Sequence, residues 1–151
     1  MLDRGAILEV KNISKKYPGV VAVEDVSLTL FRHEFVSIIG PSGCGKSTLL
    51  EMIAGLIPKT EGEVLIKGGA QANAHSSTGI VFQQESIFPW RTTLENVEFG
   101  LEMRGVPKEI RTEKSLKVIE VMGLQGFENR YPGELSGGMK QRVAIGRALV
   151  M

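Results

Sequence analysis

The chain has 151 residues, the size of one ordinary domain, which is long enough to bury a hydrophobic core. Its 18 Lys and Arg residues against 17 Asp and Glu residues give a net charge of +1, which excludes the basic footprint typical of proteins that bind nucleic acid. The single cysteine excludes an internal disulfide and fits a reducing cytoplasm, and no apolar run is long enough to insert directly into a membrane.

The N-terminal part predicts two antiparallel strands followed by a strand, a turn and a helix. Residues 7–14 alternate apolar and polar side chains, residues 17–19 (YPG) predict a turn, and residues 20–31 carry a second strand pattern. The apolar run 35–39 predicts a short buried strand that ends at a glycine-rich turn. Residues 47–56 then carry a helical pattern. The apolar face of that helix is predicted to hold Leu49, Met52, Ile53 and Leu56.

The glycine-rich turn has the form G-x-x-x-x-G-K-[ST], which between a strand and a helix indicates a phosphate-binding loop. Glycines permit backbone angles at which successive N–H groups curl around an anion, and the helix N-terminus also favours negative charge. Lys46 would reach the terminal phosphates, and Ser47 would ligate magnesium. The alternative is a Gly/Ser turn before an ordinary helix. The candidate binding residues are Gly40, Pro41, Ser42, Gly43, Cys44, Gly45, Lys46, Ser47 and Thr48.

The middle of the chain returns briefly to strand patterns. Residues 63–67 predict a short strand, residues 68–77 (GGAQANAHSS) a surface loop, and residues 78–82 a further strand. That strand runs into Gln83 and Gln84. The spacing therefore predicts an α/β arrangement up to this point.

A helical insertion is predicted over residues 92–128. Thr92 and Glu95 have the form of a capping box at the start of its first helix. Pro107 opens a longer helix that is predicted to end at about Met122. The insertion interrupts the alternation of strands and helices.

A second glycine-rich helix start follows at Ser136, Gly137 and Gly138. A hydroxyl and two backbone amides without side chains would suit another anion. Taken alone, a capping serine with two turn glycines is the simpler interpretation. The last helix is predicted over residues 139–151. Its apolar stripe would hold Met139, Val143 and Leu149, with Lys140, Arg142 and Arg147 outside.

The string LSGGMKQR at residues 135–142 resembles the signature motif of ATP-binding-cassette (ABC) ATPases, the nucleotide-binding subunits of ABC transporters, and the resemblance covers the whole chain. Residues 40–47 match the family's Walker A loop. The resemblance implies ATP and Mg²⁺ as cofactors. It implies that Tyr17 stacks on adenine, the alternative being a turn tyrosine, and that Gln83 is the Q-loop glutamine, with Gln84 as the other candidate. Lys46 and Gln83 would be catalytic, Ser47 and Gln83 would touch magnesium, and Ser136, Gly137 and Gly138 would contact the nucleotide.

The implied fold is an α/β P-loop NTPase of the ABC type. It would have an N-terminal antiparallel β part, a parallel core sheet and a helical subdomain at about 92–138, within a partial nucleotide-binding domain spanning 1–151. The implied partners are transmembrane permease subunits and a second nucleotide-binding subunit in a homodimer. In that homodimer, Ser136 and Gly138 of one chain would close on the phosphate held by Lys46 of the other. The implied location is cytoplasmic and peripheral, on the inner face of the cell membrane. Residues 83–90 (QQESIFPW) look most like those of the nitrate, sulfonate and taurine importers.

Two departures from the family pattern carry expectations. His33 stands where relatives usually have glycine, so we expect a positive φ and a modest loss of stability there. Relatives continue past the signature helix with a Walker B strand ending in Asp-Glu and then a switch histidine, whereas this chain stops at Met151. Enzymatic activity therefore stays open, because the family's catalytic glutamate and switch histidine are absent. We expect the core sheet to lack its C-terminal strands, leaving two apolar strands without neighbours, and the isolated chain not to hydrolyse ATP.

Three functions remain open from the sequence. The first is the ATP-binding subunit of an ABC importer, which would couple ATP binding and hydrolysis to solute import. The second is a non-catalytic nucleotide-binding fragment. The third is a soluble ABC protein acting on ribosomes, although such proteins usually carry two cassettes in one chain, more than 151 residues can hold.

Overall fold

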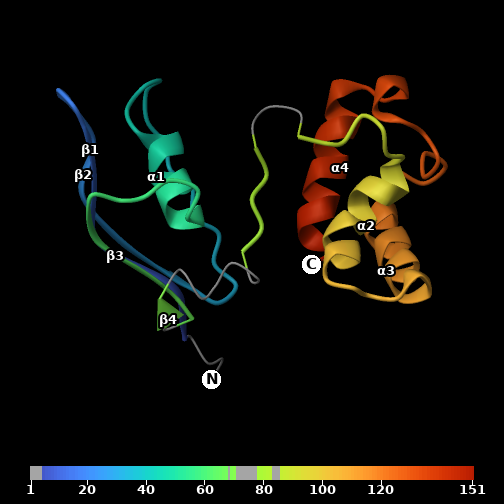
Figure 1. Ribbon diagram of the computed structural model, residues 1–151, viewed down its shortest axis with the longest axis horizontal. Helices are drawn as coiled ribbons and strands as arrows, with labels where there is room; N and C mark the ends of the chain where they lie inside the picture. Colours follow the sequence, from blue (N-terminus) through green and yellow to red (C-terminus); the bar gives the residue numbers. More distant parts are fainter. Residues whose placement is uncertain (1–4, 68, 71–77, 83–85) are drawn as a thin grey trace. The chain divides into compact units, whose positions relative to one another are not determined.

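The computed structural model describes residues 5–67, 69–70, 78–82 and 86–151. The chain divides into two compact units, Met1–Thr78 and Gly79–Met151, each with its own hydrophobic core. The first unit runs from blue to green in Figure 1, and the second from yellow-green to red.

The first unit is an antiparallel sheet with one helix packed against it (Figure 1). The strand order is β2-β1-β3-β4, and every neighbouring pair is antiparallel. The predicted hairpin is confirmed, because Tyr17 pairs with Val20 across a two-residue turn in which Gly19 has a φ of 77°. The elements are β1 (Ala6–Tyr17), β2 (Val20–Phe31), α1 (Lys46–Ala54), β3 (Glu61–Ile66) and β4 (Gly69–Ala70). The predicted surface loop at 68–77 is thus wrong at Gly69 and Ala70, and the rest of it lies outside the described residues.

The core of this unit joins α1 to the sheet. Leu49 and Met52 of α1 are buried as predicted, but Leu56 is 50% exposed. The helix ends before Leu56 because Gly55 adopts a left-handed conformation (φ 75°) and its N–H bonds to the carbonyl of Met52. The other buried members of this core are Val10, Ile13, Val23 and Val64.

The predicted buried strand at residues 35–39 is wrong. The structure assigns no strand there, and Phe35 and Ile39 are 93% and 92% exposed. A strand needs a neighbour to satisfy its N–H and C=O groups, and no described strand runs beside this segment. The described part of the chain accordingly has an antiparallel sheet and no parallel pair, so the expected parallel core sheet does not form among these residues. The expectation that two apolar core strands would lack neighbours agrees with this result.

His33 adopts the positive φ expected from the sequence, at 66°. We expect His33→Gly to raise the free energy of unfolding by about 0.5–1 kcal/mol, because glycine reaches this region without a Cβ clash. Urea denaturation measures the change. The matched control is Arg32→Gly, since Arg32 is not among the described non-glycine residues with positive φ, and there the added chain entropy should lower stability. Equal effects of the two substitutions would contradict this account.

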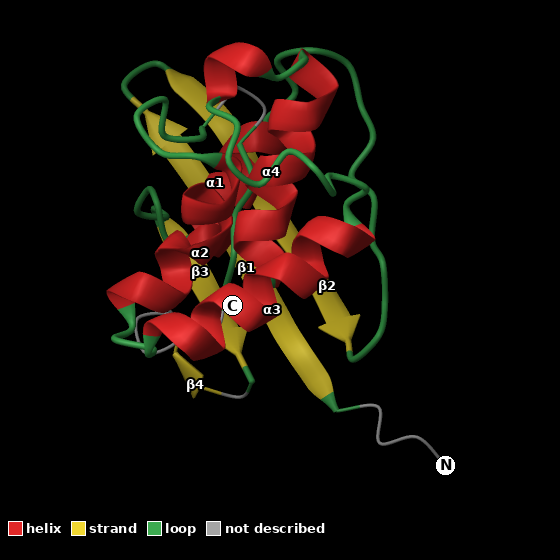
Figure 2. Ribbon diagram, turned by 90° about the vertical axis from the view of Figure 1, so that its right-hand side faces the viewer, coloured by secondary structure: helices red, strands yellow, loops and turns green. Residues whose placement is uncertain are grey.

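The second unit is helical, and its helices contact one another in all three pairings (Figure 2). The predicted capping box is confirmed: the Glu95 N–H donates to Thr92 Oγ1, and the Thr92 N–H donates to Glu95 Oε2. Pro107 precedes the second helix as predicted. The elements are α2 (Thr93–Met103), α3 (Lys108–Val121), the short 3-10 helix η2 (Pro132–Glu134) and α4 (Gly137–Leu149). No helix of the described ranges is long and apolar enough to cross a membrane.

Three predictions for this part of the chain need correction. Residues 78–82 form no strand in the structure, again without a described neighbouring strand. The last helix begins at Gly137, two residues earlier than predicted, because the Ser136 hydroxyl accepts the N–H of Met139 and caps it. Leu149 is 61% exposed, whereas Val143 is fully buried. Met139 is partly buried and packs against the same core as Val143, so the predicted stripe is wrong only at Leu149.

Candidate nucleotide site

The glycine-rich loop at residues 40–45 folds as a tight turn onto the start of α1. Gly43 and Gly45 have φ values of 80° and 93°, in the left-handed region that the motif requires. Gly40 is not among the described glycines with positive φ, and its role is spatial, since a Cβ there would lie 2.8 Å from Cys44 Sγ. Loop geometry of this kind is set by glycine chemistry alone, which is why the sequence could predict it.

Lys46 is the first residue of α1, and its side chain folds back over the loop. Its Nζ donates to the carbonyls of Gly40 at 2.9 Å and of Pro41 at 2.5 Å, and lies 3.5 Å from Cys44 Sγ. The first turn of α1 carries no acidic residue, so the positive end of the helix dipole and the ammonium group act together. An anion at this loop would meet both, with the exposed Ser47 hydroxyl beside them.

Tyr17 lies at the end of the hairpin that borders the loop. A Cβ on Gly45 would come 2.4 Å from the carbonyl oxygen of Ala22, so the hairpin end and the loop are in close contact. The Tyr17 ring is 46% exposed, and Lys15 Nζ lies 4.9 Å from its centroid. A second planar ring would therefore find one aromatic face flanked by a cation.

The metal-binding residues are only partly placed. Ser47 is described and exposed, which fits a single hydroxyl ligand to magnesium, whereas Gln83 and Gln84 lie outside the described residues. Across residues 5–67, 69–70, 78–82 and 86–151, no group of three or more His, Cys, Asp or Glu side chains is placed to hold a metal ion. Among the described residues, the Ser47 hydroxyl is the expected magnesium ligand that the structure places, and phosphate oxygens would complete the coordination.

The second glycine-rich helix start is open to solvent. Ser136, Gly137 and Gly138 are exposed, and a Cβ on either glycine would meet no atom within 4 Å. The Ser136 hydroxyl caps the helix, as the simpler interpretation predicted, and the first turn of α4 has no acidic residue. Both glycine-rich elements thus precede helix N-termini without a nearby carboxylate, each in its own unit.

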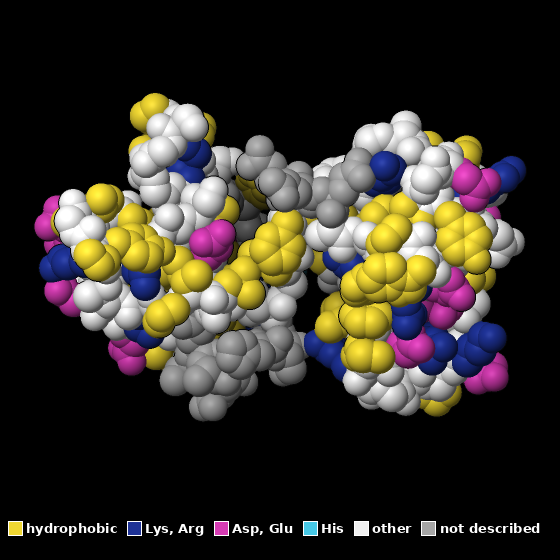
Figure 3. All heavy atoms as spheres, turned by 45° about the horizontal axis from the view of Figure 1, so that its top comes forward, with side chains coloured by type: hydrophobic (Ala, Val, Ile, Leu, Met, Phe, Trp, Pro, Cys, Tyr) yellow, Lys and Arg dark blue, Asp and Glu magenta, His cyan; other side chains and the backbone are white. Residues whose placement is uncertain are grey.

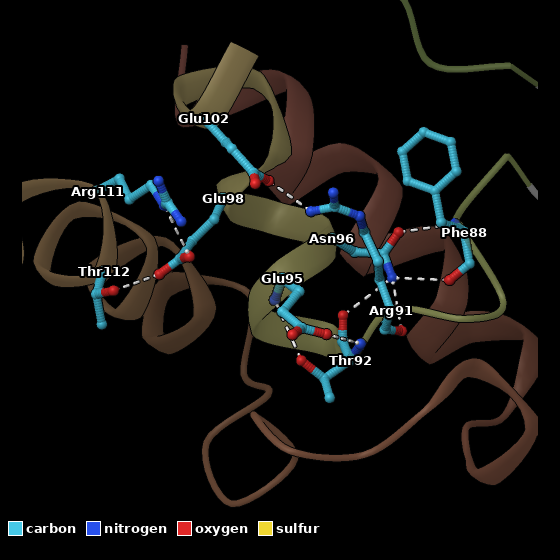
Figure 4. A network of polar contacts seen from close by, with 9 residues as sticks. All are labelled: Phe88, Arg91, Thr92, Glu95, Asn96, Glu98, Glu102, Arg111 and Thr112. Atoms are coloured by element: carbon cyan, nitrogen blue, oxygen red, sulfur yellow. Dashed lines mark hydrogen bonds and ion pairs between the residues drawn. The ribbon is translucent and has the colours of Figure 1, made fainter. Parts of the chain in front are cut away.

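Sequence reasoning missed Asn96, which binds the backbone of the loop that precedes α2 (Figure 4). Asn96 is fully buried; its Oδ1 accepts the N–H of Phe88 at 2.7 Å, and its Nδ2 donates to the carbonyls of Phe88, Arg91 and Thr92 at 2.9–3.1 Å. The available signal was a polar residue at a buried position of an amphipathic helix, which must find partners.

Charged side chains of α2 also bind the segments next to this helix. Arg91 donates to Glu102, and this hydrogen bond lowers the pKa of the Glu102 carboxyl below its ordinary value. The nearly buried Glu98 accepts from Arg111 and Thr112 of α3 (Figure 4). On the face shown in Figure 3, hydrophobic side chains gather beside charged ones, and among the exposed hydrophobic residues Trp90 is 71% exposed.

A profile of the family described as "ABC transporter" matches residues 23–151. An uncharacterized ABC transporter ATP-binding protein of Methanocaldococcus jannaschii is 49% identical over 146 residues, which covers 94% of this chain and 55% of the relative. The taurine import ATP-binding protein of Escherichia coli strain K12 is 42% identical over 143 residues, covering 95% of this chain and 56% of that protein. The chain spans about half the length of the curated relatives it matches.

Solved structures agree with these relatives. A dimeric bacterial ABC transporter cassette has a TM-score of 0.85 and 39% identity, covering 95% of this chain and 69% of the other. An ATP-binding cassette in a post-hydrolysis state, bound to ADP and phosphate, has a TM-score of 0.85 and 38% identity at the same coverage. The Walker-like loop at 40–47 and the signature-like string at 135–142 both lie within the matched residues, and the chain belongs to the ABC transporter family of ATP-binding proteins.

Proposed function

We propose that this chain binds ATP through the loop at residues 40–48, as part of the ATP-binding subunit of an ABC importer. The observation that carries the proposal is the position of Lys46, whose ammonium lies against the loop carbonyls at the positive end of α1. A terminal phosphate there would replace bonds from the ammonium to neutral carbonyls with hydrogen bonds between opposite charges.

The remaining site residues take the following proposed roles. Backbone amides of residues 40–45 hold the phosphates, and Tyr17 stacks on the adenine. Ser47 and Gln83 ligate Mg²⁺, which when bound neutralises phosphate charge. Ser136, Gly137 and Gly138 contact the nucleotide held by a second subunit.

The proposed assembly follows the matched proteins. One solved relative is a dimeric cassette, and one curated relative is named a taurine import protein. We propose a homodimer of nucleotide-binding subunits, on the cytoplasmic inner face of the membrane, with transmembrane permease subunits as partners. A helical subdomain at about 92–138 and the Q-loop at Gln83 would face those partners, and the exposed Trp90 would lie on that surface.

Titration with MgATP tests the proposal. Lys46→Ala is expected to weaken MgATP binding by about 10- to 100-fold, because a hydrogen bond from a charged donor contributes about 1.5–3 kcal/mol. The matched control is Lys117→Ala, which removes the same charge from an exposed pair on α3 and should leave the affinity unchanged.

Two outcomes would overturn the proposal: no binding of MgATP by the wild-type chain, or equal affinity of the Lys46→Ala variant. Binding does not require hydrolysis. Because the isolated chain is expected not to hydrolyse ATP, binding of MgATP without turnover fits the ATP-binding subunit and the non-catalytic alternative alike.

A further inference from the structure

Arg147 joins the last turn of α4 to the loop that precedes α2. Its Nη2 donates to the carbonyl oxygen of Ser86 at 2.7 Å and to Ser86 Oγ at 3.2 Å. Its Cζ lies 5.1 Å from the centroid of the Phe88 ring. The sequence predicted this side chain on the outside of the helix, and that prediction is wrong, because the loop covers it.

The loop at residues 86–91, hereafter the aromatic loop, is therefore held from two helices. Asn96 of α2 binds it through three side-chain hydrogen bonds, and Arg147 of α4 binds its first residue, Ser86. The Phe88 ring links the two sides, since it packs edge-on against Phe99 of α2 at 4.6 Å and under the Arg147 guanidinium.

Burial separates an inner and an outer side of the aromatic loop. Ile87 is 8% exposed, whereas Trp90 is 71% exposed and its ring centroid lies 5.5 Å from that of Phe88. Burial also lowers the pKa of the Arg147 guanidinium below its ordinary value, and this group always keeps its charge in proteins. Its described partners are a carbonyl, a hydroxyl and an aromatic ring, all uncharged. The planar, forked guanidinium makes such contacts directional, so they fix the orientation of the loop.

We propose that Arg147 is a positioning residue that fixes the aromatic loop to α4, the helix that begins at Ser136. The two residues are eleven positions apart, about 16 Å along one rigid helix. A displacement at the N-terminus of α4 is then passed to Trp90, on the surface proposed to face the permease. This inference rests on the proposed function, because it takes Ser136, Gly137 and Gly138 as a nucleotide contact.

The test uses Trp90, which is the only tryptophan of the chain, so that indole fluorescence reports this loop alone. Arg147→Lys keeps the charge but loses the forked donors and the flat stacking face. We expect the amplitude of the nanosecond component of Trp90 anisotropy decay to rise at least twofold in Arg147→Lys and in Arg147→Gln. Far-UV circular dichroism should match the wild type.

The matched control is Arg142→Lys on the same helix, because the hydrogen bonds described for Arg142 go to the carbonyls of Met122 and Gly123 and not to residues 86–91. Its Trp90 anisotropy should equal that of the wild type. A merely structural role of Arg147 would lower the midpoint of unfolding and leave the anisotropy of the folded state unchanged, and that result would overturn the proposal. If Arg147→Gln does not fold, Phe88→Leu replaces it in the test. Phe88→Leu alone should raise the amplitude of the nanosecond component of Trp90 anisotropy decay by the same factor. The double variant with Arg147→Lys should show no larger amplitude than either single variant.

A second arm tests transmission from the nucleotide. At saturating MgATP, the change in Trp90 emission should be at least twofold smaller in Arg147→Lys than in the wild type and in Arg142→Lys. An equal change, or none in a wild-type chain that binds MgATP, would overturn the transmission. The anisotropy experiment needs no nucleotide. A failure of ATP binding would therefore overturn the proposed function, while the anisotropy result would still decide whether Arg147 positions the loop.

Discussion

Gly45→Ala is expected to lower the free energy of unfolding of the first unit by about 2–5 kcal/mol and to abolish binding of MgATP. Gly45 has a φ of 93°, where a residue with a Cβ costs about 1–2 kcal/mol. That Cβ would also lie 2.4 Å from the carbonyl oxygen of Ala22 and 3.1 Å from Val23 Cγ2. The nearest atom belongs to the backbone of β2 and cannot rotate away, so the loop or the strand must shift. Urea denaturation and titration with MgATP measure the two effects.

Substitutions at two other glycines of the glycine-rich motifs distinguish the cost of a positive φ from the cost of the steric clash with Ala22. Gly43 also has a positive φ, of 80°, but a Cβ there would meet no atom within 4 Å, so Gly43→Ala should cost only about 1–2 kcal/mol. Gly138 has neither feature, and Gly138→Ala should change stability by less than about 0.5 kcal/mol. If Gly45→Ala proved as stable as Gly43→Ala, the contact with Ala22 would have no energetic weight.

Asn96→Leu is expected to destabilise the second unit by about 2–5 kcal/mol and to release the aromatic loop. The carbonyls of Phe88 and Thr92 keep backbone donors, from Arg91 at 3.2 Å and from Asn96 itself at 2.9 Å. The Phe88 N–H and the Arg91 carbonyl lose the side-chain partner that the structure gives them. Each buried polar group left without a partner costs about 1–3 kcal/mol. Urea denaturation followed by circular dichroism gives the energy, and Trp90 emission reports the loop.

Two further substitutions at the same position check the cause. Asn96→Asp retains an acceptor for the Phe88 N–H but sets a carboxylate against three carbonyl oxygens, so it should also be destabilising at neutral pH. Asn96→Ala leaves room for water to reach these groups, and its loss should be smaller than that of Asn96→Leu. An Asn96→Leu variant within about 0.5 kcal/mol of the wild type would show that the loop does not depend on this side chain.

Features that depend on residues a few positions apart were predicted well from the sequence. The turn that ends at Gly19, the capping box of Thr92 and Glu95, and the left-handed Gly43 and Gly45 all appear where the sequence placed them. Each depends on residues a few positions apart: a glycine that reaches positive φ, or a side chain that reaches the N–H three residues on. Whether these residues bind nucleotide stays a prediction that titration must test.

Features that depend on contacts between residues far apart in the sequence were not predicted. Phe35 and Ile39 have the composition of a buried strand, yet they are exposed, because burial depends on a neighbouring strand and not on the segment itself. Arg147 has the composition of a surface position, yet it contacts Ser86, 61 residues away in the chain. The polarity of Asn96 is visible in the sequence, but its four hydrogen bonds to Phe88, Arg91 and Thr92 are not.

The sequence by itself determined the left-handed glycines of the loop at residues 40–45, the helix starts at residues 46 and 137 to within two residues, and membership of the ABC transporter family. Only the tertiary structure decided which apolar segments are covered and which polar side chains hold the aromatic loop. The physical reason is range: backbone angles and helix caps are set by adjacent residues, whereas burial and side-chain partners depend on segments that folding brings together.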